Sequence, residues 1–563
     1  MEDRVPPYRG SGPPSGGQEQ NVGGCARGHF TKSRRVASPW TAAISKASFL
    51  GAVGRAANAG RRWICACVLF LCGSAWAAAP APEFLHPPGA GLGSTNLVRV
   101  TGKLDPWPPK IWVDAPGLSF LARTNQGEFQ VTVNADAVPG PRLVRFFNDE
   151  GASEPKPFVI GGGPELLEVE PNDQFTHAQR IEKLPVTING WLEKAGDVDC
   201  FAVDLKSGQV LEAAVDSVVL MSRLDAVLRL VNTSGVQLAW NNDFATIDPR
   251  LTWRATNDQT VVVQIFGFPY PAVSDVRLTG GDGAIYRLHL ELVRPTETCA
   301  NQVDTAGSPP PLVELPFSAT NWIHAPGELH RVRLRVAEPG WIAAEARAEA
   351  VGSPLDAWLR LDDAKGKVIS RNDDHDGSRD PYLEWQAATN VEYTIVVGSL
   401  TRLAGEEQRF ELSLRRVEPD YVASTAASSL SLKPGSTNEL AVTVTHLRGF
   451  TNEVRLAVTN LPPGITVEPV VAPAKDGEAK LMFVARTNAP TFQGPFQIEA
   501  RDAVTGKNRT VPFLLTGGTV NNGVPGGYRV LLSDRINDLW MTVLAPEPPK
   551  AAAKDAKSTK TEK

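Results

Sequence analysis

One stretch of this sequence occurs twice. Residues 224–230 read LDAVLRL, and residues 355–361 read LDAWLRL, 131 positions further along the chain. Trp253 and Trp385 recur at nearly the same interval. An interval of one domain length indicates a tandem duplication of a folding unit. Each copy alternates apolar and polar residues in short runs, which is typical of half-buried antiparallel strands.

The same alternation continues on both sides of the duplication. The chain has 563 residues, too many for one core, and its 49 Gly and 45 Pro fall between short apolar runs. The sequence therefore predicts an all-β protein of tandem antiparallel β-sandwich domains, jelly-roll-like and Ig-like. We expect an N-terminal extension and signal peptide at 1–77, an Ig-like sandwich at 80–163, the two duplicated sandwiches at 164–295 and 296–418, an Ig-like sandwich with a terminal strand at 419–545, and a disordered tail at 546–563.

The N-terminal region contains an export signal. Arg61 and Arg62 precede an apolar run at 63–72 and an A-x-A motif at 75–77, which predicts cleavage after Ala77. The run is shorter than the roughly 20 residues of a spanning helix, so no membrane span is expected. We expect an exported chain that is extracellular, on the cell surface or periplasmic. About sixty residues precede the signal, which leaves two readings open: a start assigned too early, or a long disordered pre-region.

Charge and cysteine content exclude several kinds of site. The whole chain has a net charge of −5, although the first 62 residues are basic, so the remainder is acidic and lacks the basic face that binds nucleic acid. After the predicted cleavage only Cys200 and Cys299 remain. Two cysteines make neither a disulfide scaffold nor a zinc site. They could form one bridge, or Cys200 could simply be buried as an apolar residue.

One short acidic stretch contains candidate metal ligands. Residues 168–173 read EVEPND, and residues 197 and 199 are a second pair of acids two positions apart, at the start of a strand. Alternate residues of an extended chain point the same way, and Pro171 favours extended geometry before it. A cluster of hard oxygens without nitrogen or sulfur suits Ca²⁺; the alternative is a solvated acidic linker. The predicted calcium ligands are Glu168, Glu170, Asn172, Asp173, Asp197 and Asp199.

This pattern resembles a known family. The EVEPND stretch, Ala178, the GDVDCF stretch at 196–201 and the duplicated strand together resemble the bacterial pre-peptidase C-terminal domain, and they are similar to the collagen-binding domains of bacterial collagenases. The resemblance covers about residues 164–294, and 296–418 only through the duplicated core. It implies a jelly-roll-like sandwich appended to secreted proteins, often proteases, with calcium in some members at the six matching positions. The sequence departs from the family at Cys200, where an aromatic residue is common.

The second copy lacks an E-x-E-P-N-D stretch, so we expect no equivalent calcium site there. The chain also lacks the H-E-x-x-H, G-x-S-x-G and phosphate-loop motifs, and we therefore expect no enzyme. The predicted function is exported, non-catalytic binding, adhesion or substrate targeting, with an extracellular protein or polysaccharide as partner, possibly a separate secreted protease. One alternative is an accessory or remnant subunit of a secreted hydrolase. Another is an enzyme with an unrecognised site, because catalytic triads are defined by geometry.

Overall fold

The computed structural model describes residues 78–244, 247–269, 278–293, 309–373, 375, 378–402, 404–516 and 532–546. The predicted signal peptide and nearly all of the predicted disordered tail lie outside these ranges. Within them strands are the dominant regular structure, and the one helical element is a 3₁₀ turn, Glu349–Val351. The predicted all-β fold of tandem β-sandwiches is confirmed. No helix in the described ranges is long and apolar enough to span a membrane.

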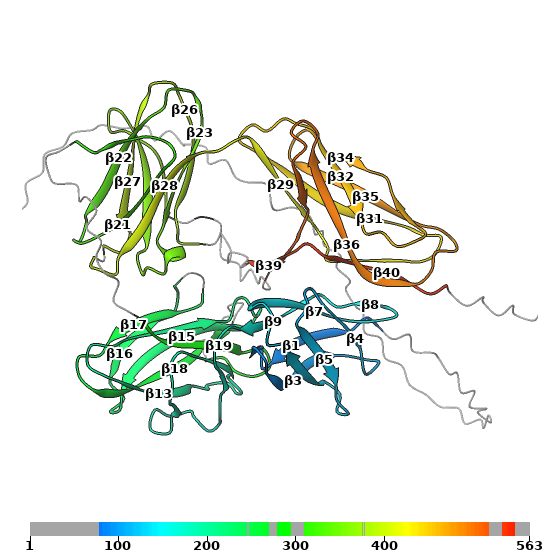
Figure 1. Cartoon of the computed structure of the whole chain (residues 1–563), viewed down its shortest axis with the longest axis horizontal. Helices are drawn as coiled ribbons and strands as arrows, with labels where there is room; N and C mark the ends of the chain where they lie inside the picture. Colours follow the sequence, from blue (N-terminus) through cyan, green and yellow to red (C-terminus); the bar gives the residue numbers. More distant parts are fainter. Residues whose placement is uncertain are drawn as a thin grey trace, which may run out of the picture. The chain divides into compact units, whose positions relative to one another are not determined.

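The first sandwich consists of two sheets, β1-β3-β6-β5 and β2-β9-β7-β4, with β8 paired to β7 (Figure 1). The sequence alternates over residues 128–133 and so predicts a strand there; β6 has these bounds, with Phe129, Val131 and Val133 buried. The strands are β1 (Ala81–His86), β2 (Gly89–Gly91), β3 (Thr95–Lys103), β4 (Lys110–Val113), β5 (Leu118–Ala122), β6 (Glu128–Val133), β7 (Gly140–Asn148), β8 (Gly151–Ala152) and β9 (Lys156–Gly161).

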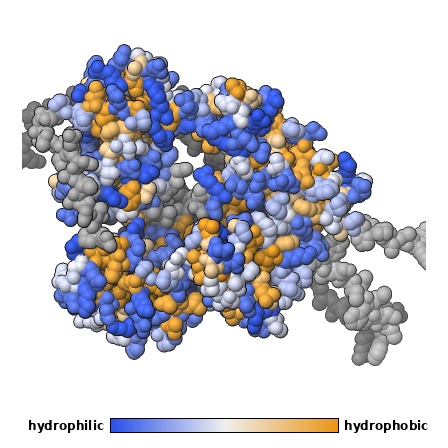
Figure 2. Space-filling model, viewed as in Figure 1, coloured by the Kyte–Doolittle hydropathy of each residue, from blue (hydrophilic) through white to orange (hydrophobic). Residues whose placement is uncertain are grey.

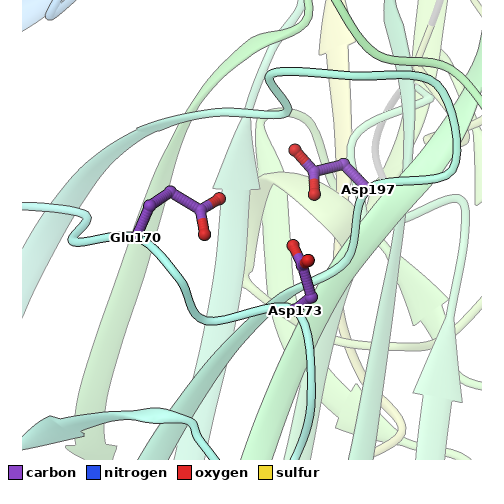
Figure 3. Close-up of side chains that lie close together, drawn as sticks. All are labelled: Glu170, Asp173 and Asp197. Carbon is purple, nitrogen blue, oxygen red and sulfur yellow. The ribbon is translucent and has the colours of Figure 1, made fainter.

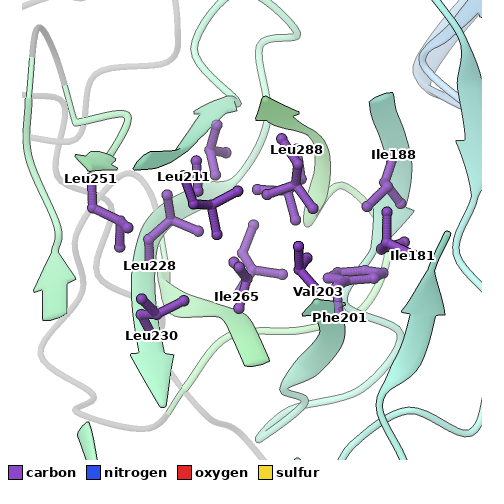
Figure 4. Close-up of a cluster of buried hydrophobic side chains, with 14 of the residues drawn as sticks. Ile181, Ile188, Phe201, Val203, Leu211, Leu228, Leu230, Leu251, Ile265 and Leu288 are labelled. Carbon is purple, nitrogen blue, oxygen red and sulfur yellow. The ribbon is translucent and has the colours of Figure 1, made fainter. Parts of the chain in front are cut away.

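The next sandwich, here called the first repeat, has sheets β10-β12-β19-β14-β17 and β11-β13-β18-β15-β16. Leucine, isoleucine, valine and Phe201 side chains from both sheets interlock between them (Figure 4). The strands are β10 (Glu165–Leu167), β11 (Gln179–Ile181), β12 (Val186–Trp191), β13 (Asp199–Leu205), β14 (Val210–Asp216), β15 (Leu224–Asn232), β16 (Gln237–Asn241), β17 (Arg250–Arg254), β18 (Gln259–Pro269) and β19 (Ile285–Val293).

The second repeat has a matching strand order, in sheets β21-β28-β23-β26 and β20-β22-β27-β24-β25, except that no strand among its described residues corresponds to β10. Its core is a separate cluster that includes Leu359 and Leu361 from the duplicated stretch, as well as Trp385. The strands are β20 (Leu312–Val313), β21 (Phe317–Trp322), β22 (Leu329–Arg335), β23 (Gly340–Arg347), β24 (Ala357–Asp363), β25 (Val368–Asn372), β26 (Tyr382–Ala387), β27 (Glu392–Ser399) and β28 (Arg409–Arg416).

The last sandwich has sheets β33-β35-β31-β29-β38-β39 and β30-β40-β36-β32-β34, with β37 on β36. The terminal strand β40 pairs back onto a sheet, where it lies between β30 and β36. A predicted strand at 528–532 falls almost entirely outside the described residues. The strands are β29 (Asp420–Thr425), β30 (Ser429–Leu432), β31 (Thr437–Leu447), β32 (Val454–Thr459), β33 (Ile465–Val467), β34 (Val470–Val471), β35 (Gly477–Ala485), β36 (Phe492–Asp502), β37 (Asn508–Thr510), β38 (Phe513–Thr516), β39 (Leu532–Ile536) and β40 (Leu539–Val543).

The two repeats can be matched residue by residue. Gly190 pairs with Tyr286 between β12 and β19, and Asn321 pairs with Phe410 between β21 and β28. The 131-residue interval that separates the duplicated stretches also separates Gly190 from Asn321. Positions that share this register are therefore structurally equivalent, which makes each repeat a reference for the other.

Candidate metal centre

The predicted ligands come from two segments that meet at one end of the first repeat. One segment follows β10, which pairs in parallel with β12 and so fixes where residue 168 lies. The backbone N–H of Glu168 donates to Asn189 O at 3.1 Å. The other segment is the turn that leads into β13, and it carries Asp197 and Asp199. Alternating extended geometry on both segments turns their carboxylates toward each other, as the sequence predicted.

A buried pair anchors the first segment. Arg287 is 1% exposed, and its guanidinium donates to both Glu165 carboxylate oxygens, at 2.7 and 3.1 Å. Asn189 completes the group, because its Oδ1 accepts from Arg287 Nη1 and its Nδ2 donates to Glu165 Oε2, each at 2.7 Å. A bidentate guanidinium–carboxylate pair has fixed geometry. It therefore holds β10 on the sheet and sets the starting point of the acidic stretch.

Glu168 and Asp199 form an inner pair of carboxylates. The Tyr286 hydroxyl lies 2.8 Å from Glu168 Oε2 and 2.5 Å from Asp199 Oδ2. Asp199 is fully buried, and burial is the main cause that raises the pKa of both carboxyls. Repulsion from the Glu168 carboxylate further raises the pKa of Asp199. Burial and repulsion therefore both disfavour two ionised carboxylates at this place, and a cation beside them would favour the ionised pair.

Gly190 makes room for this pair. A Cβ atom at this position would lie 2.1 Å from Tyr286 Cζ and 2.5 Å from Glu168 Oε2. Without a side chain at residue 190, the Glu168 carboxylate lies against the β12 backbone and accepts a hydrogen bond from the Trp191 N–H at 2.9 Å. Only glycine permits this close approach to the β12 backbone.

Glu170, Asp173 and Asp197 form an outer trio (Figure 3). One carboxylate oxygen from each lies within 4.8 Å of the others, close enough for all three to ligate one ion. The turn before β13 orients Asp197, whose Oδ2 accepts from the Glu193 N–H at 2.6 Å. Burial raises the pKa of Glu170 and of Asp197, whereas hydrogen bonding to Asp197 and to Lys194 lowers the pKa of Asp173.

Several buried polar atoms between the two groups lack a hydrogen-bond partner among the described residues. They are Glu170 Oε1, Asn172 Oδ1, Asn172 Nδ2, Asp197 Oδ1 and Asp199 Oδ1. Asn172 is fully buried, so its amide oxygen cannot be satisfied by bulk water. Buried polar atoms nearly always have hydrogen-bond partners, so buried oxygens without one on both segments are candidate ligands for a cation. Four of the six predicted ligands contribute to this set.

The residues fit a calcium ion. Carboxylate and amide oxygens are all the side-chain donors that the segments offer, and six to eight such ligands in a flexible arrangement are what Ca²⁺ takes. Lys194 is the competing cation: its Nζ lies 3.1 Å from Asp173 Oδ2 and 3.4 Å from Asp197 Oδ1. The Lys194 side chain is 59% exposed, so it can move into solvent when an ion enters.

The loop that follows the acidic stretch packs on the outer face of the sheet. Phe175 lies over Cys200, Val231 and Val262. A Cβ at Gly235 would meet the Phe175 ring at 3.0 Å. Cys200 is fully buried, accepts from Gln264 Nε2 at 3.2 Å and makes no disulfide with a described residue. Its possible partner Cys299 lies outside the described residues, so the predicted choice between a bridge and a buried thiol stays open.

The equivalent end of the second repeat is built differently. Glu328 keeps the turn acid, with Oε2 accepting from His324 N–H at 2.6 Å and Ala325 N–H at 2.9 Å. His330 takes the place of Asp199, and Phe410 that of Tyr286; the two rings are 5.2 Å apart. The positions that match Glu168 to Asp173 lie outside the described residues.

Sequence reasoning found the six acidic and amide positions but missed the residues that support them. Tyr286, Gly190 and Lys194 contact the cluster, yet none lies in the acidic stretches. A signal for the first two existed in the duplication, where Tyr286 matches Phe410 and Gly190 matches Asn321. A position that is apolar in one copy and hydroxylated in the other marks a local difference in chemistry.

No family model matches the chain, and no curated protein matches it. Among solved structures, it is similar to the fibronectin(III)-like modules of Clostridium thermocellum CbhA, with 9% identity over 41% of this chain and 94% of that one, and a TM-score of 0.12. It is also similar to the M60 catalytic domain with CBM51 domains of Clostridium perfringens ZmpB, with 7% identity over 60% and 54% of the two chains, and a TM-score of 0.13.

A third similar structure is elastase-activated alpha-2-macroglobulin of Escherichia coli, with 10% identity over 83% of this chain and 44% of that one, and a TM-score of 0.13. The chain thus spans about half the length of the second and third of these proteins. Similarity at this level assigns no ligand or activity to this chain.

Proposed function

We propose that this protein is an exported, non-catalytic binding protein whose first repeat is stabilised by calcium. The observation that carries the calcium assignment is the group of buried oxygens without a hydrogen-bond partner on Glu170, Asn172, Asp197 and Asp199. The resemblance of the first repeat to the pre-peptidase C-terminal domain supports the same site. Export rests on the signal-like sequence before residue 78. The partner is an extracellular polysaccharide or protein.

The calcium ion would be held by the six predicted residues and would tie the segment after β10 to the turn before β13. Without a cation, repulsion among the carboxylates opposes their approach. A bound ion reverses this repulsion and stabilises only the closed arrangement. Because the unfolded chain does not present these oxygens together, ion binding adds to folding stability.

The buried acids support a structural rather than a catalytic role. Paired carboxylates can serve as general acid and base, but a catalytic carboxylate must come within hydrogen-bonding reach of a substrate. Asp199 is fully buried beneath Tyr286, and Glu168 is held by the Trp191 N–H. Their place inside the sandwich favours ion binding.

A second catalytic-looking group has a simple structural explanation. The Thr187 hydroxyl lies 2.9 Å from His289 Nδ1, and His289 Nε2 lies 2.8 Å from Asp216 Oδ2. The three residues occupy neighbouring strands β12, β19 and β14, where Thr187 and His289 are directly paired. His289 and Asp216 are 36% and 42% exposed. We interpret the group as a cross-strand polar ladder on an open sheet face.

Thermal unfolding tests the calcium site. With Ca²⁺ at 100 times its dissociation constant, the first repeat should gain about 2.7 kcal/mol, which raises its melting temperature by on the order of 10 °C. Chelator should remove the gain, and Mg²⁺ should substitute poorly because it requires tighter octahedral geometry. Asp197→Asn should abolish the calcium response.

Glu328→Gln is the matched control, because Glu328 occupies the same turn in the second repeat, and it should leave the response intact. If wild-type unfolding is indifferent to millimolar Ca²⁺ and calorimetry detects no binding, the acidic segment is a solvated linker. A response that survives in Asp197→Asn would place the ion elsewhere.

A further inference from the structure

A lysine reaches into the candidate metal centre from the turn that orients Asp197. The ammonium of Lys194 lies 3.2 and 3.1 Å from the two carboxylate oxygens of Asp173, and 3.4 Å from Asp197 Oδ1. Both acids belong to the outer trio, whose carboxylates are turned toward one another in Figure 3. The positive charge of the lysine thus lies beside the oxygens that we assign to the ion.

This contact differs from an ordinary surface ion pair. Hydrophilic and hydrophobic residues are mixed over the visible face of each sandwich (Figure 2), and exposed ion pairs on such a surface contribute little to stability. Lys206 and Asp258 form one of these pairs, at 2.9 Å, and both side chains are exposed. Asp197, by contrast, is buried, and the Lys194 side chain that reaches it is 59% exposed. The lysine therefore brings a charge from the surface to a carboxylate that bulk water does not solvate.

The turn itself does not require a lysine. In the first repeat, Asp197 Oδ2 accepts from the Lys194 N–H at 3.4 Å, and in the second, Glu328 Oε2 accepts from the Ala325 N–H at 2.9 Å. Each turn has a glycine with positive φ one position before its acid. Ala325 is therefore the equivalent of Lys194, at the same interval of 131 residues. Since the second repeat keeps the turn without a lysine, Lys194 is specific to the repeat that has the six predicted ligands.

The ammonium satisfies only part of the acidic cluster. A lysine has three N–H donors, and those of Lys194 face two of the outer carboxylates. Buried oxygens of Glu170, Asn172 and Asp199 have no hydrogen-bond partner among the described residues. A calcium ion takes six to eight oxygen ligands and could contact these oxygens as well. Exchange of the lysine for the ion therefore increases the number of oxygens that have a partner.

The lysine side chain can leave without disturbing the turn. Its backbone is held in place, because the Asp197 N–H donates to Lys194 O at 3.1 Å, and a Cβ at Gly280 would lie 1.8 Å from the same oxygen. The side chain beyond this point is mostly exposed. A released ammonium is strongly hydrated and its stem is flexible. Rotation of one side chain is therefore enough to open the outer trio to an ion.

We propose that Lys194 is an internal counter-ion that holds the outer trio in the ion-free protein and is exchanged for calcium when the ion binds. The exchange sets the affinity of the site, because each binding event displaces one ion-paired lysine. It also keeps the acidic stretch against the turn when no ion is bound, since a cation lies beside the carboxylates in both states. This inference rests on the proposed calcium site and concerns how that site is regulated.

Lysine labelling of the full chain tests the exchange. Limited acetylation, read for each lysine by mass spectrometry, compares the protein in chelator with the protein in saturating Ca²⁺. An amine held by two carboxylates is less available to the reagent, so calcium should raise the acetylation rate of Lys194 several-fold. Lys206 is the matched control, because it follows the other end of β13 and pairs with Asp258. It should react at the same rate in both buffers.

Calorimetry of three variants tests the effect on affinity. Lys194→Met removes the competing pair and should bind calcium roughly twofold to fivefold more tightly than the wild type, the factor expected from an exposed ion pair. Lys194→Arg restores a competing cation and should bind no more tightly than the wild type. Lys206→Met removes the same charge elsewhere in the first repeat and should leave the affinity unchanged.

The outcomes separate this exchange from the calcium site itself. An unchanged acetylation rate of Lys194, in a protein that calorimetry shows to bind calcium, would overturn the exchange and leave the site in place. Equal gains of affinity in Lys194→Met and Lys206→Met would also overturn it, because they would indicate an effect of overall charge. If neither the wild type nor any variant binds calcium, the calcium site is wrong and the exchange falls with it.

Discussion

The two repeats have matching strand orders but different chemistry at the end where β13 and β22 begin. Both place an acid in the preceding turn, Asp197 in one and Glu328 in the other, and both acids accept hydrogen bonds from turn amides. Two positions later the first repeat has Asp199 and the second has His330. The turn acid is thus part of the shared fold, whereas the additional acid belongs to the site that we assign to calcium.

The largest expected difference between the repeats concerns Arg287. Arg287→Met removes the partner of the buried Glu165 carboxylate, and breaking a buried ion pair costs about 3–5 kcal/mol. The matching residue, Glu411, pairs with Arg347 at 2.8 Å, but their side chains are 32% and 43% exposed. Glu411→Gln should therefore cost about 1 kcal/mol or less. Chemical denaturation of both variants measures the difference.

Equal losses in the two variants would contradict the view that the Arg287 pair anchors the segment before the acidic stretch. The first variant should also weaken calcium binding, because it releases β10 from the sheet. The second variant should leave calcium binding unchanged.

A smaller difference is expected at Gly190. Gly190→Ala places a methyl group where Tyr286 and the Glu168 carboxylate lie, and overpacking of this kind costs about 1–3 kcal/mol. Its counterpart Asn321 already carries a side chain at the matching position, so Asn321→Ala should change stability by about 0.5 kcal/mol or less. Melting curves with and without Ca²⁺ test both effects. A Gly190→Ala protein with normal stability and normal calcium response would show that the close approach is not needed.

The smallest expected effect depends on pH. Burial raises the pKa of Asp248 to about 6, although the hydrogen bonds that Asp248 accepts from Ser217 and Val218 lower it. The folded state therefore binds more protons than the unfolded state between about pH 4 and 6. Stability is highest below this window and falls as the pH rises through it. Lowering the pH from 7 to 5 should stabilise the first repeat by about 1–2 kcal/mol through this group.

Asp248→Asn should flatten this slope in part, because burial also raises the pKa of Asp225 to about 6. The readout is the difference between wild-type and variant unfolding free energies across the pH range, in chelator. Asp380→Asn gives the equivalent change in the second repeat. An unchanged slope in Asp248→Asn would mean that Asp248 keeps an ordinary pKa.

Much of the fold could be predicted from local pattern. Alternation in 128–133 identified β6, and the 131-residue interval identified two copies of one sandwich. Short strands such as β2 and β8 were missed, because their glycine and alanine residues show no alternation. Edge strands of this kind are specified by their neighbours and not by their own side chains.

The candidate site was likewise predicted only where local sequence spacing determines it. The acids were found because extended spacing places alternate side chains on one side. Tyr286 was missed because it lies about 90 residues beyond Asp199, and only the register of β12 with β19 brings it to Glu168. The division into an inner pair and an outer trio also depends on where the sheet ends, which no local spacing encodes.

The packing of Phe175 over Cys200 has a consequence for the chemistry of the thiol. In its reduced form Cys200 has a pKa that burial raises to about 11, so the reactive thiolate is scarce, and Phe175 packs against it. Oxidation then needs the loop to open, which a local fluctuation can supply without global unfolding. Since the same loop continues from Asn172 and Asp173, the rate of thiol modification reports how firmly the acidic stretch is closed. The modification rate of this one thiol is therefore an internal measure of how ordered the metal centre is.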